Sequence, residues 1–248
     1  MKKYLFIFNW QTYLVVGLAI LSSFITLRFQ IRIYFDFIFL GLFIAFPLTF
    51  SLREAFRRRE RALRYLSVFS ASLQSSFCHF ENAKLERFTK QEFRSILTNI
   101  SNVLMQYLSG KGQDAPELKK ATDAVFIFVR DNREKLKGGL GEKVLSFQQR
   151  INECVEFLLA TKRHRTPWGV RAMVILAVYV FAIFYPASLL ADKGFNVASW
   201  HVFTMTAFKS LFLISLCNVQ LLLEDPFDQQ GADNIRLDDF QFTGVIAA

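Results

Sequence analysis

The ionisable side chains that stand out in this sequence are those that interrupt or end its long apolar runs. Lys209 lies well inside the fourth run, where a charge in a membrane is costly and normally faces a partner or water. The same run ends in Glu224-Asp225-Pro226-Phe227. A helix must stop there, because Pro226 has no backbone donor and pushes Asp225 toward extended geometry. Two carboxylates at a helix C-terminus also oppose its dipole, so this turn is a candidate functional site.

Residues for conventional catalysis or for a metal site are not grouped in the sequence. The three histidines, His79, His164 and His201, fall in different regions, and no nucleophile, phosphate-loop or dinucleotide motif occurs. The three cysteines are odd in number and far apart, which fits buried free thiols better than disulfides or a metal site; they are Cys78, Cys154 and Cys217. We therefore do not expect an enzyme.

A stripe of large apolar residues runs along the second apolar segment. Leu42, Phe46 and Phe50 follow one another at four-residue steps, on one face of a helix. In a single chain this stripe indicates lipid contact or packing. If several copies surround an axis, the stripe instead forms stacked apolar rings, which can gate by dewetting. The basic run Arg57-Arg58-Arg59 likewise fits either an interfacial anchor or an ion-attracting vestibule.

The elements that would position these residues are four membrane-length helices. The 248 residues are 52% hydrophobic and include 29 Phe, but only 11 Gly and 5 Pro. A bilayer core needs about 20 mostly apolar residues per helix. The predicted spans form two hairpins and are Tyr4–Leu27, Ile33–Leu52, Ala172–Ala191 and Val197–Leu223.

The charge distribution predicts how these spans are oriented. Of the 30 Lys and Arg residues, 23 lie between Arg53 and Arg171, against 13 of the 21 Asp and Glu residues, so this block is net +10. The positive-inside rule places it in the cytoplasm, with both termini on the same side of the cell membrane. The overall charge of +9 is explained by topology and anionic lipid headgroups. We expect no nucleic-acid binding.

The charged block itself predicts a helical layer. Apolar residues recur at three- and four-residue steps from Leu63 to Phe80, from Phe93 to Tyr107, from Leu118 to Val129 and from Val144 to Leu159. Glycines at Gly110-Lys111-Gly112 and Gly138-Gly139-Leu140-Gly141 should stop the helices. The sequence thus predicts an all-α membrane protein with four parts: transmembrane hairpins at 1–52 and 172–223, a helical cytoplasmic region at 53–171, and an acidic cytoplasmic tail at 224–248.

Three stretches resemble the bestrophin family of membrane channels, particularly its short bacterial members. The first runs from Phe39-Leu40-Gly41 through Phe50 to Ala62 and looks like the family's second span with the start of its long cytoplasmic helix. The second is Thr166-Pro167 followed by Tyr179 and Phe184-Tyr185-Pro186. The third is Glu224-Asp225-Pro226-Phe227, similar to the family's Asp-Pro-Phe signature, and its trailing segment Ala232-Asp233-Asn234-Ile235-Arg236-Leu237.

The resemblance implies a passive ion channel in a bacterial inner membrane. It implies a homopentamer around a central pore, with Leu42, Phe46 and Phe50 lining an apolar neck, and chloride or another small anion as the conducted ion. The rival interpretation is a membrane-anchored helical scaffold or signalling module that conducts nothing. Our sequence departs from the family at Ser51-Leu52-Arg53, just after the neck, and at Asp228, which replaces a glycine.

Calcium is the one cofactor that the resemblance raises. Animal members of the family bind calcium through a run of acidic residues after the signature turn, whereas the acids here are scattered. Calcium needs six to eight oxygen ligands in a compact cage. We therefore expect no cofactor. The candidate residues serve either calcium or docking of the tail, and they are Asp228, Asp233, Asn234 and Asp238.

Overall fold

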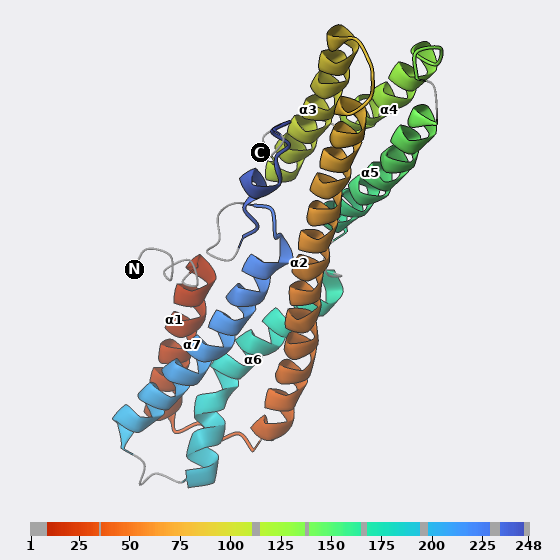
Figure 1. The fold of residues 1–248 in the computed structure, drawn as a ribbon. Helices are drawn as coiled ribbons and strands as arrows, with labels where there is room; N and C mark the ends of the chain where they lie inside the picture. The colour runs from red at the N-terminus through yellow and green to blue at the C-terminus, as the bar shows by residue number, and fades with distance from the viewer. Residues whose placement is uncertain are drawn as a thin grey trace. The chain divides into compact units, whose positions relative to one another are not determined.

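The computed structural model describes residues 9–34, 36–110, 115–136, 139–164, 168–193, 198–228 and 234–245. Within these ranges the regular structure is entirely helical (Figure 1), which confirms the all-α prediction. The helices are α1 (Trp10–Phe29), α2 (Phe37–Glu81), α3 (Arg87–Ser109), α4 (Ala115–Asp131), α5 (Leu140–Arg163), α6 (Trp168–Lys193), α7 (Ser199–Glu224) and the short 3₁₀ helix η2 (Leu237–Phe240).

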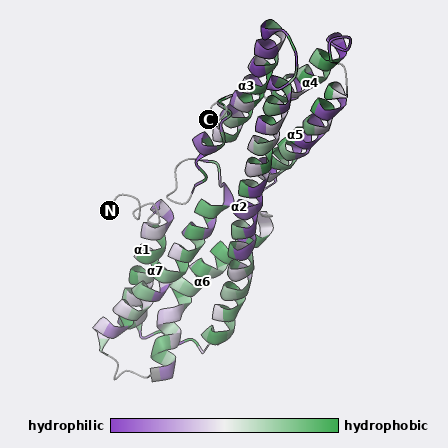
Figure 2. Cartoon of the chain, in the orientation of Figure 1, coloured by the Kyte–Doolittle hydropathy of each residue, from purple (hydrophilic) through white to green (hydrophobic). Residues whose placement is uncertain are grey.

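The chain divides into two compact units. Unit 1 comprises Met1–Arg57 and Thr166–Glu224, and unit 2 comprises Arg58–Arg165 and Asp225–Ala248. Four helical stretches contain a segment long and apolar enough to cross a membrane: α1, α2, α7 and Leu140–Asp192, which covers α5, most of α6 and residues outside the described ranges. Figure 2 shows hydrophobic residues predominating in α1, α6, α7 and the first part of α2, whereas hydrophobic and hydrophilic residues alternate along α3, α4 and α5.

Small and weakly polar residues allow the helices of unit 1 to pack closely. α1 packs against both α6 and α7, and α6 packs against α7. The buried residues of α1 include Val15, Ala19 and Ser23, and small side chains of this kind let membrane helices approach each other. One buried hydrogen bond crosses between helices, where the Asn218 amide of α7 donates to the Thr12 hydroxyl of α1 at 2.8 Å.

α2 begins at Phe37, four residues after Ile33, where the predicted span begins. The Asp36 carboxylate accepts hydrogen bonds from the backbone N–H groups of Ile38 and Phe39 at 2.9 and 3.1 Å. These bonds satisfy donors that a helix leaves unpaired at its N-terminus, so Asp36 is the cap of α2. The residues at 33–34 therefore precede the helix rather than belong to it.

The apolar residues that recur at helical spacing in the charged block form the core of unit 2. As predicted, α2 continues without interruption to Glu81 and buries Leu66, Phe69 and Leu73 along one face. α3 ends at Ser109 because Gly110 adopts a left-handed conformation (φ 72°), and its N–H group bonds back to the carbonyls of Gln106 and Tyr107. The predicted helix end at Gly110 is thus confirmed, whereas α4 ends at Asp131, before the second glycine run, and α5 begins at Leu140 within that run.

Candidate functional site: the exposed face of α2, the turn after α7 and the Lys209 cavity

The predicted neck residues lie together on the exposed face of α2. In the single chain Leu42, Phe46 and Phe50 are 49%, 59% and 62% exposed. Ile44 and Leu48 are buried in the core of unit 1. Each lies two residues beyond a member of the stripe, and two residues correspond to about 200° around a helix. The stripe therefore points away from the helices that α2 packs against.

Basic side chains continue the same face of α2 below the stripe. Arg53 and Arg57 follow Phe50 at helical spacing and are exposed. The Arg57 guanidinium pairs with the Glu54 carboxylate at 2.9 Å, and both side chains are about half exposed. An exposed pair of this kind contributes little stability. Glu54 is the next residue at the four-residue step of the stripe and balances Arg57, so Arg53 leaves one net positive charge here and the face changes from apolar to charged within about one turn.

The first residue of the signature turn is buried in unit 1. The Glu224 side chain is only 3% exposed, and its carboxylate lies 3.5 Å from the Arg171 guanidinium of α6. The amide of Gln220, one turn earlier in α7, donates to the same carboxylate at 3.3 Å. These partners offset the unfavourable position of an acid at the helix C-terminus. Arg171 is the last residue of the net positive block that the sequence shows between Arg53 and Arg171.

The next three residues of the turn belong to unit 2. The Asp225 carboxylate accepts a hydrogen bond from the backbone N–H of Phe227 at 3.1 Å. The carbonyl of Pro226 accepts one from the backbone N–H of Ile235 at 3.0 Å, which closes the loop between these residues. The Phe227 ring is fully buried in the core of unit 2.

The described acids after the turn do not form a calcium cage. Asn234 donates through its amide nitrogen to the Asp228 carboxylate, and that nitrogen is not a calcium ligand. Asp238 lies in η2 and is exposed, while Asp233 lies outside the described residues. In the described ranges no three His, Cys, Asp or Glu side chains come together as a metal site. The residues present therefore fit closure of the loop better than the six to eight oxygens that calcium requires.

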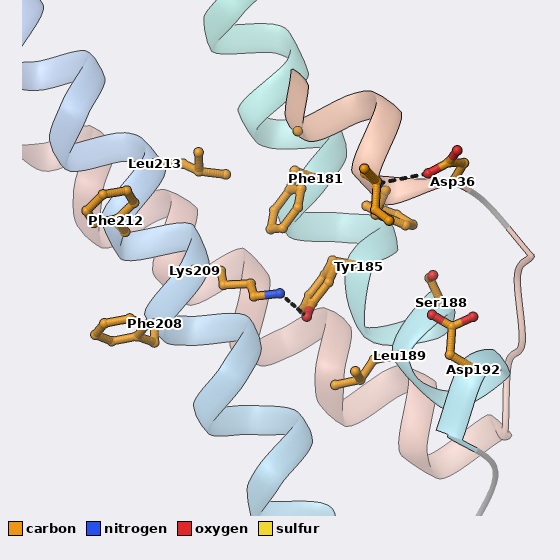
Figure 3. Close-up of a pocket in the computed structure, with 13 residues that line it drawn as sticks. Asp36, Phe181, Tyr185, Ser188, Leu189, Asp192, Phe208, Lys209, Phe212 and Leu213 are labelled. Atoms are coloured by element: carbon orange, nitrogen blue, oxygen red, sulfur yellow. Dashed lines mark hydrogen bonds between the residues drawn. The ribbon is translucent and has the colours of Figure 1, made fainter. Parts of the chain in front are cut away.

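Lys209 faces an aromatic cavity of unit 1 (Figure 3). Its ammonium donates to the Tyr185 hydroxyl at 2.6 Å and lies 4.5 Å from the centre of the Tyr185 ring. The Tyr185 ring stacks on Phe181 at 4.7 Å between centroids and meets the edge of Phe37 at 5.6 Å. The Lys209 charge is thus held by a hydroxyl and a π face, two partners that reduce the cost of its depth in the helix.

The cysteines of the described residues are free. Cys154 and Cys217 are buried, as predicted, and Cys78 is half-buried. Burial raises the pKa of the Cys154 thiol in unit 2 to about 11, with a further upward contribution from neighbouring Glu153 that is partly offset by Arg150. A thiol with this pKa is unreactive near neutral pH.

Sequence reasoning missed the partners of the candidate residues. Tyr185 was noted only as part of an aromatic-proline landmark, and Arg171 only as the boundary of the basic block. One signal for Tyr185 was available, because it lies eight residues before the end of α6 and Lys209 lies ten residues after the start of α7. In an antiparallel pair joined by a short connection, such positions come to similar depth.

The arrangement defines a class first: an all-helical membrane protein with four candidate spans, a second helical unit and an exposed apolar stripe on its longest helix. Solved structures with this fold exist. A bacterial bestrophin homologue from Klebsiella pneumoniae, carrying a point mutation, matches with a TM-score of 0.76 and 17% identity over 92% of this chain and 94% of that one. Another variant of the homologue from Klebsiella pneumoniae matches with a TM-score of 0.78 and 16% identity over 93% and 96% of the two chains. A structure described as a membrane protein matches with a TM-score of 0.79 and 17% identity over 94% and 95%.

At this level of identity the likeness establishes the fold. This chain is a bestrophin-like membrane protein in its architecture, as the sequence motifs predicted. No protein-family model matches the sequence, and no curated protein matches it.

Proposed function

We propose that this protein is a passive ion channel of bestrophin type, in which α2 of each subunit lines a central pore. The observation that carries the proposal is the stripe formed by Leu42, Phe46 and Phe50. A single chain exposes these large apolar side chains on the face of α2 opposite its own core. In five copies around an axis they would form three stacked apolar rings, and such a constriction gates by excluding water.

The charges beside the stripe support conduction of anions. An apolar neck does not by itself choose the sign of an ion. Arg53 follows the stripe on the same face, where the charge of Arg57 is balanced by Glu54, and a ring of Arg53 side chains at a pore mouth would raise the local concentration of small anions. We therefore propose chloride or another small inorganic anion as the conducted ion. The expected location is the bacterial inner membrane, with both termini in the cytoplasm.

The decisive experiment measures currents from the purified protein in planar bilayers. Unitary currents with a reversal potential that follows the chloride gradient are expected, together with five subunits by native mass. Phe46→Ala removes one ring and should increase conductance or open probability. Phe24→Ala is the matched control, because Phe24 lies on α1 and is also 59% exposed; this variant should conduct like the wild type.

Two results would refute the proposal. If Phe46→Ala and Phe24→Ala channels had the same conductance and gating as the wild type, the stripe would not be the neck. If the protein were a monomer or dimer without currents, the non-conducting scaffold would be the better description.

A further inference from the structure

A cavity of about 740 Å³ lies in unit 1 between the start of α2, the end of α6 and the first half of α7. This volume is within the range that accommodates small molecules and parts of lipids. One wall is the aromatic group of Phe37, Phe181 and Tyr185, described above. Figure 3 shows the remaining side chains around this group, with Lys209 on the α7 side. No residue of the proposed neck lines this cavity.

The charges of the cavity are separated by sign. Lys209 provides the ammonium on one side, and Asp36 and Asp192 provide carboxylates on the other. Within the described residues, neither carboxylate comes within ion-pairing distance of the Lys209 ammonium, which bonds to the Tyr185 hydroxyl instead. The cavity is therefore complementary to a molecule that has both an anionic and a cationic group, and less so to one with a single charge.

The apolar surface next to Lys209 indicates that this molecule has a hydrocarbon part. Phe208 and Phe212 line the cavity and are 65% and 58% exposed. Phe208 precedes Lys209 in α7 and Phe212 lies three residues farther into the helix than Lys209, whereas Asp192 lies at the end of α6, near the connection to α7. From the connected ends of α6 and α7 inward, the cavity thus offers the Asp192 carboxylate, then the Lys209 ammonium and then the Phe212 ring.

This order matches a phospholipid with a zwitterionic headgroup. We propose that the cavity binds such a lipid, with its phosphate at Lys209, its ammonium at Asp36 and Asp192, and an acyl chain along Phe212 and Leu213. In a bilayer the headgroup ammonium lies outermost, the phosphate beneath it and the chains deepest, the same order as the three surfaces. A fatty acid or an anionic phospholipid would satisfy Lys209 but would place no cation between the carboxylates.

The test compares lipids on the full-length protein in its purified assembly. The probes are phosphatidylethanolamine and phosphatidylglycerol with identical chains, and affinity is measured by native mass spectrometry. Phosphatidylethanolamine is expected to bind more tightly. Lys209→Gln should weaken its binding by about tenfold, the loss expected when one charge-assisted contact is removed. Asp192→Asn should remove most of the preference over phosphatidylglycerol.

Control variants separate this effect from a loss of folding. Lys209→Arg keeps the charge and should retain most of the affinity. Lys143→Gln removes an exposed lysine from α5 and should leave binding unchanged. Equal or tighter binding of phosphatidylglycerol would overturn the proposal, and so would unchanged binding by Lys209→Gln. No binding of either lipid would overturn it too, as expected if a second copy covers the cavity. If soluble phosphoethanolamine, at the same concentration as the lipid, displaced phosphatidylethanolamine, the proposal of a lipid would be overturned in favour of a soluble zwitterion.

The readout does not depend on conduction. Loss of lipid binding in a protein with normal currents would overturn this inference and leave the proposed function standing. Binding of phosphatidylethanolamine by a protein that passes no current would overturn the proposed function and leave the lipid inference standing.

Discussion

The prediction that most directly tests the signature turn is the loss of the Phe227 ring. Phe227 is fully buried among the core residues of unit 2, although it belongs to a loop. Replacing a buried Phe by Ala typically costs about 3–5 kcal/mol, because transfer free energy is lost and a cavity remains. Unfolding entropy is about 2.1 cal/mol/K per residue, so a unit of roughly 130 residues should lose about 10–18 °C in melting temperature.

A buried thiol in the same unit provides the assay. Cys154 is 1% exposed and lies in the same core cluster, and its raised pKa keeps it unreactive while the unit is folded. In a background with Cys78→Ser and Cys217→Ala, a thiol-reactive dye added during heating therefore reports unfolding around Cys154. The Phe227→Ala variant should react at a temperature about 10–18 °C lower than the same background with Phe227 intact.

The control for this prediction is Phe88→Ala. Phe88 is in α3 of the same unit and is 76% exposed, so its removal should change stability by no more than about 0.5 kcal/mol. A difference of about 2 °C corresponds to well under 1 kcal/mol for a unit of this size. If the melting temperatures of Phe227→Ala and Phe88→Ala differed by no more than that, the Phe227 ring would not be a core residue. The assignment of the turn as a structural anchor would then be wrong.

Four further outcomes are expected. Burial raises the pKa of the Cys154 thiol from 9.0 to about 11, so the folded state retains the thiol proton more strongly than the unfolded state. The contribution of this proton to stability is complete below pH 9 and is lost as the pH rises to about 11. Thermal unfolding of the wild type and of Cys154→Ala across this pH range would detect the loss. Arg171→Gln should destabilise the protein by about 1–3 kcal/mol, which is less than the loss of a fully buried ion pair, because the Arg171 side chain is 36% exposed. In a double-mutant cycle, adding Glu224→Gln should recover part of this loss. In the proposed channel, Arg53→Gln should lower the anion-to-cation permeability ratio by roughly threefold or more, read from reversal potentials in a salt gradient; an unchanged ratio would exclude Arg53 from the pore mouth. Calcium at millimolar concentration should alter neither current nor melting temperature, since the described acids make no cage of the kind it requires; a rise in melting temperature would contradict this.

The helices were predictable because their signals are local. Apolar residues at helical spacing predicted the buried faces of α2, α4 and α5, and Gly110 predicted the end of α3. The contacts of the charged residues depend on how distant helices align, and no local pattern contains that information. Lys209 and Tyr185 are 24 residues apart, Arg171 and Glu224 are 53 apart, and Thr12 and Asn218 are 206 apart. The sequence therefore identified Lys209 and Glu224 as residues that need partners, but not the partners that they have, and it gave no sign of the bond between Thr12 and Asn218.

The structure of the turn after α7 explains why two acids and a proline follow one another at the end of this helix. Glu224 is the last residue of unit 1 and Asp225 the first of unit 2, and the residues on either side of this boundary are held separately. Arg171 fixes the carboxylate of Glu224 in unit 1, while the Phe227 ring is fixed in the core of unit 2. Between these anchors, Pro226 restricts the backbone and the Asp225 carboxylate bonds the N–H of Phe227. Each side of the boundary is thus held within its own unit, and the acids that appeared unfavourable for a helix end have partners there: Glu224 bonds to Arg171 and Gln220, and Asp225 to the backbone of Phe227.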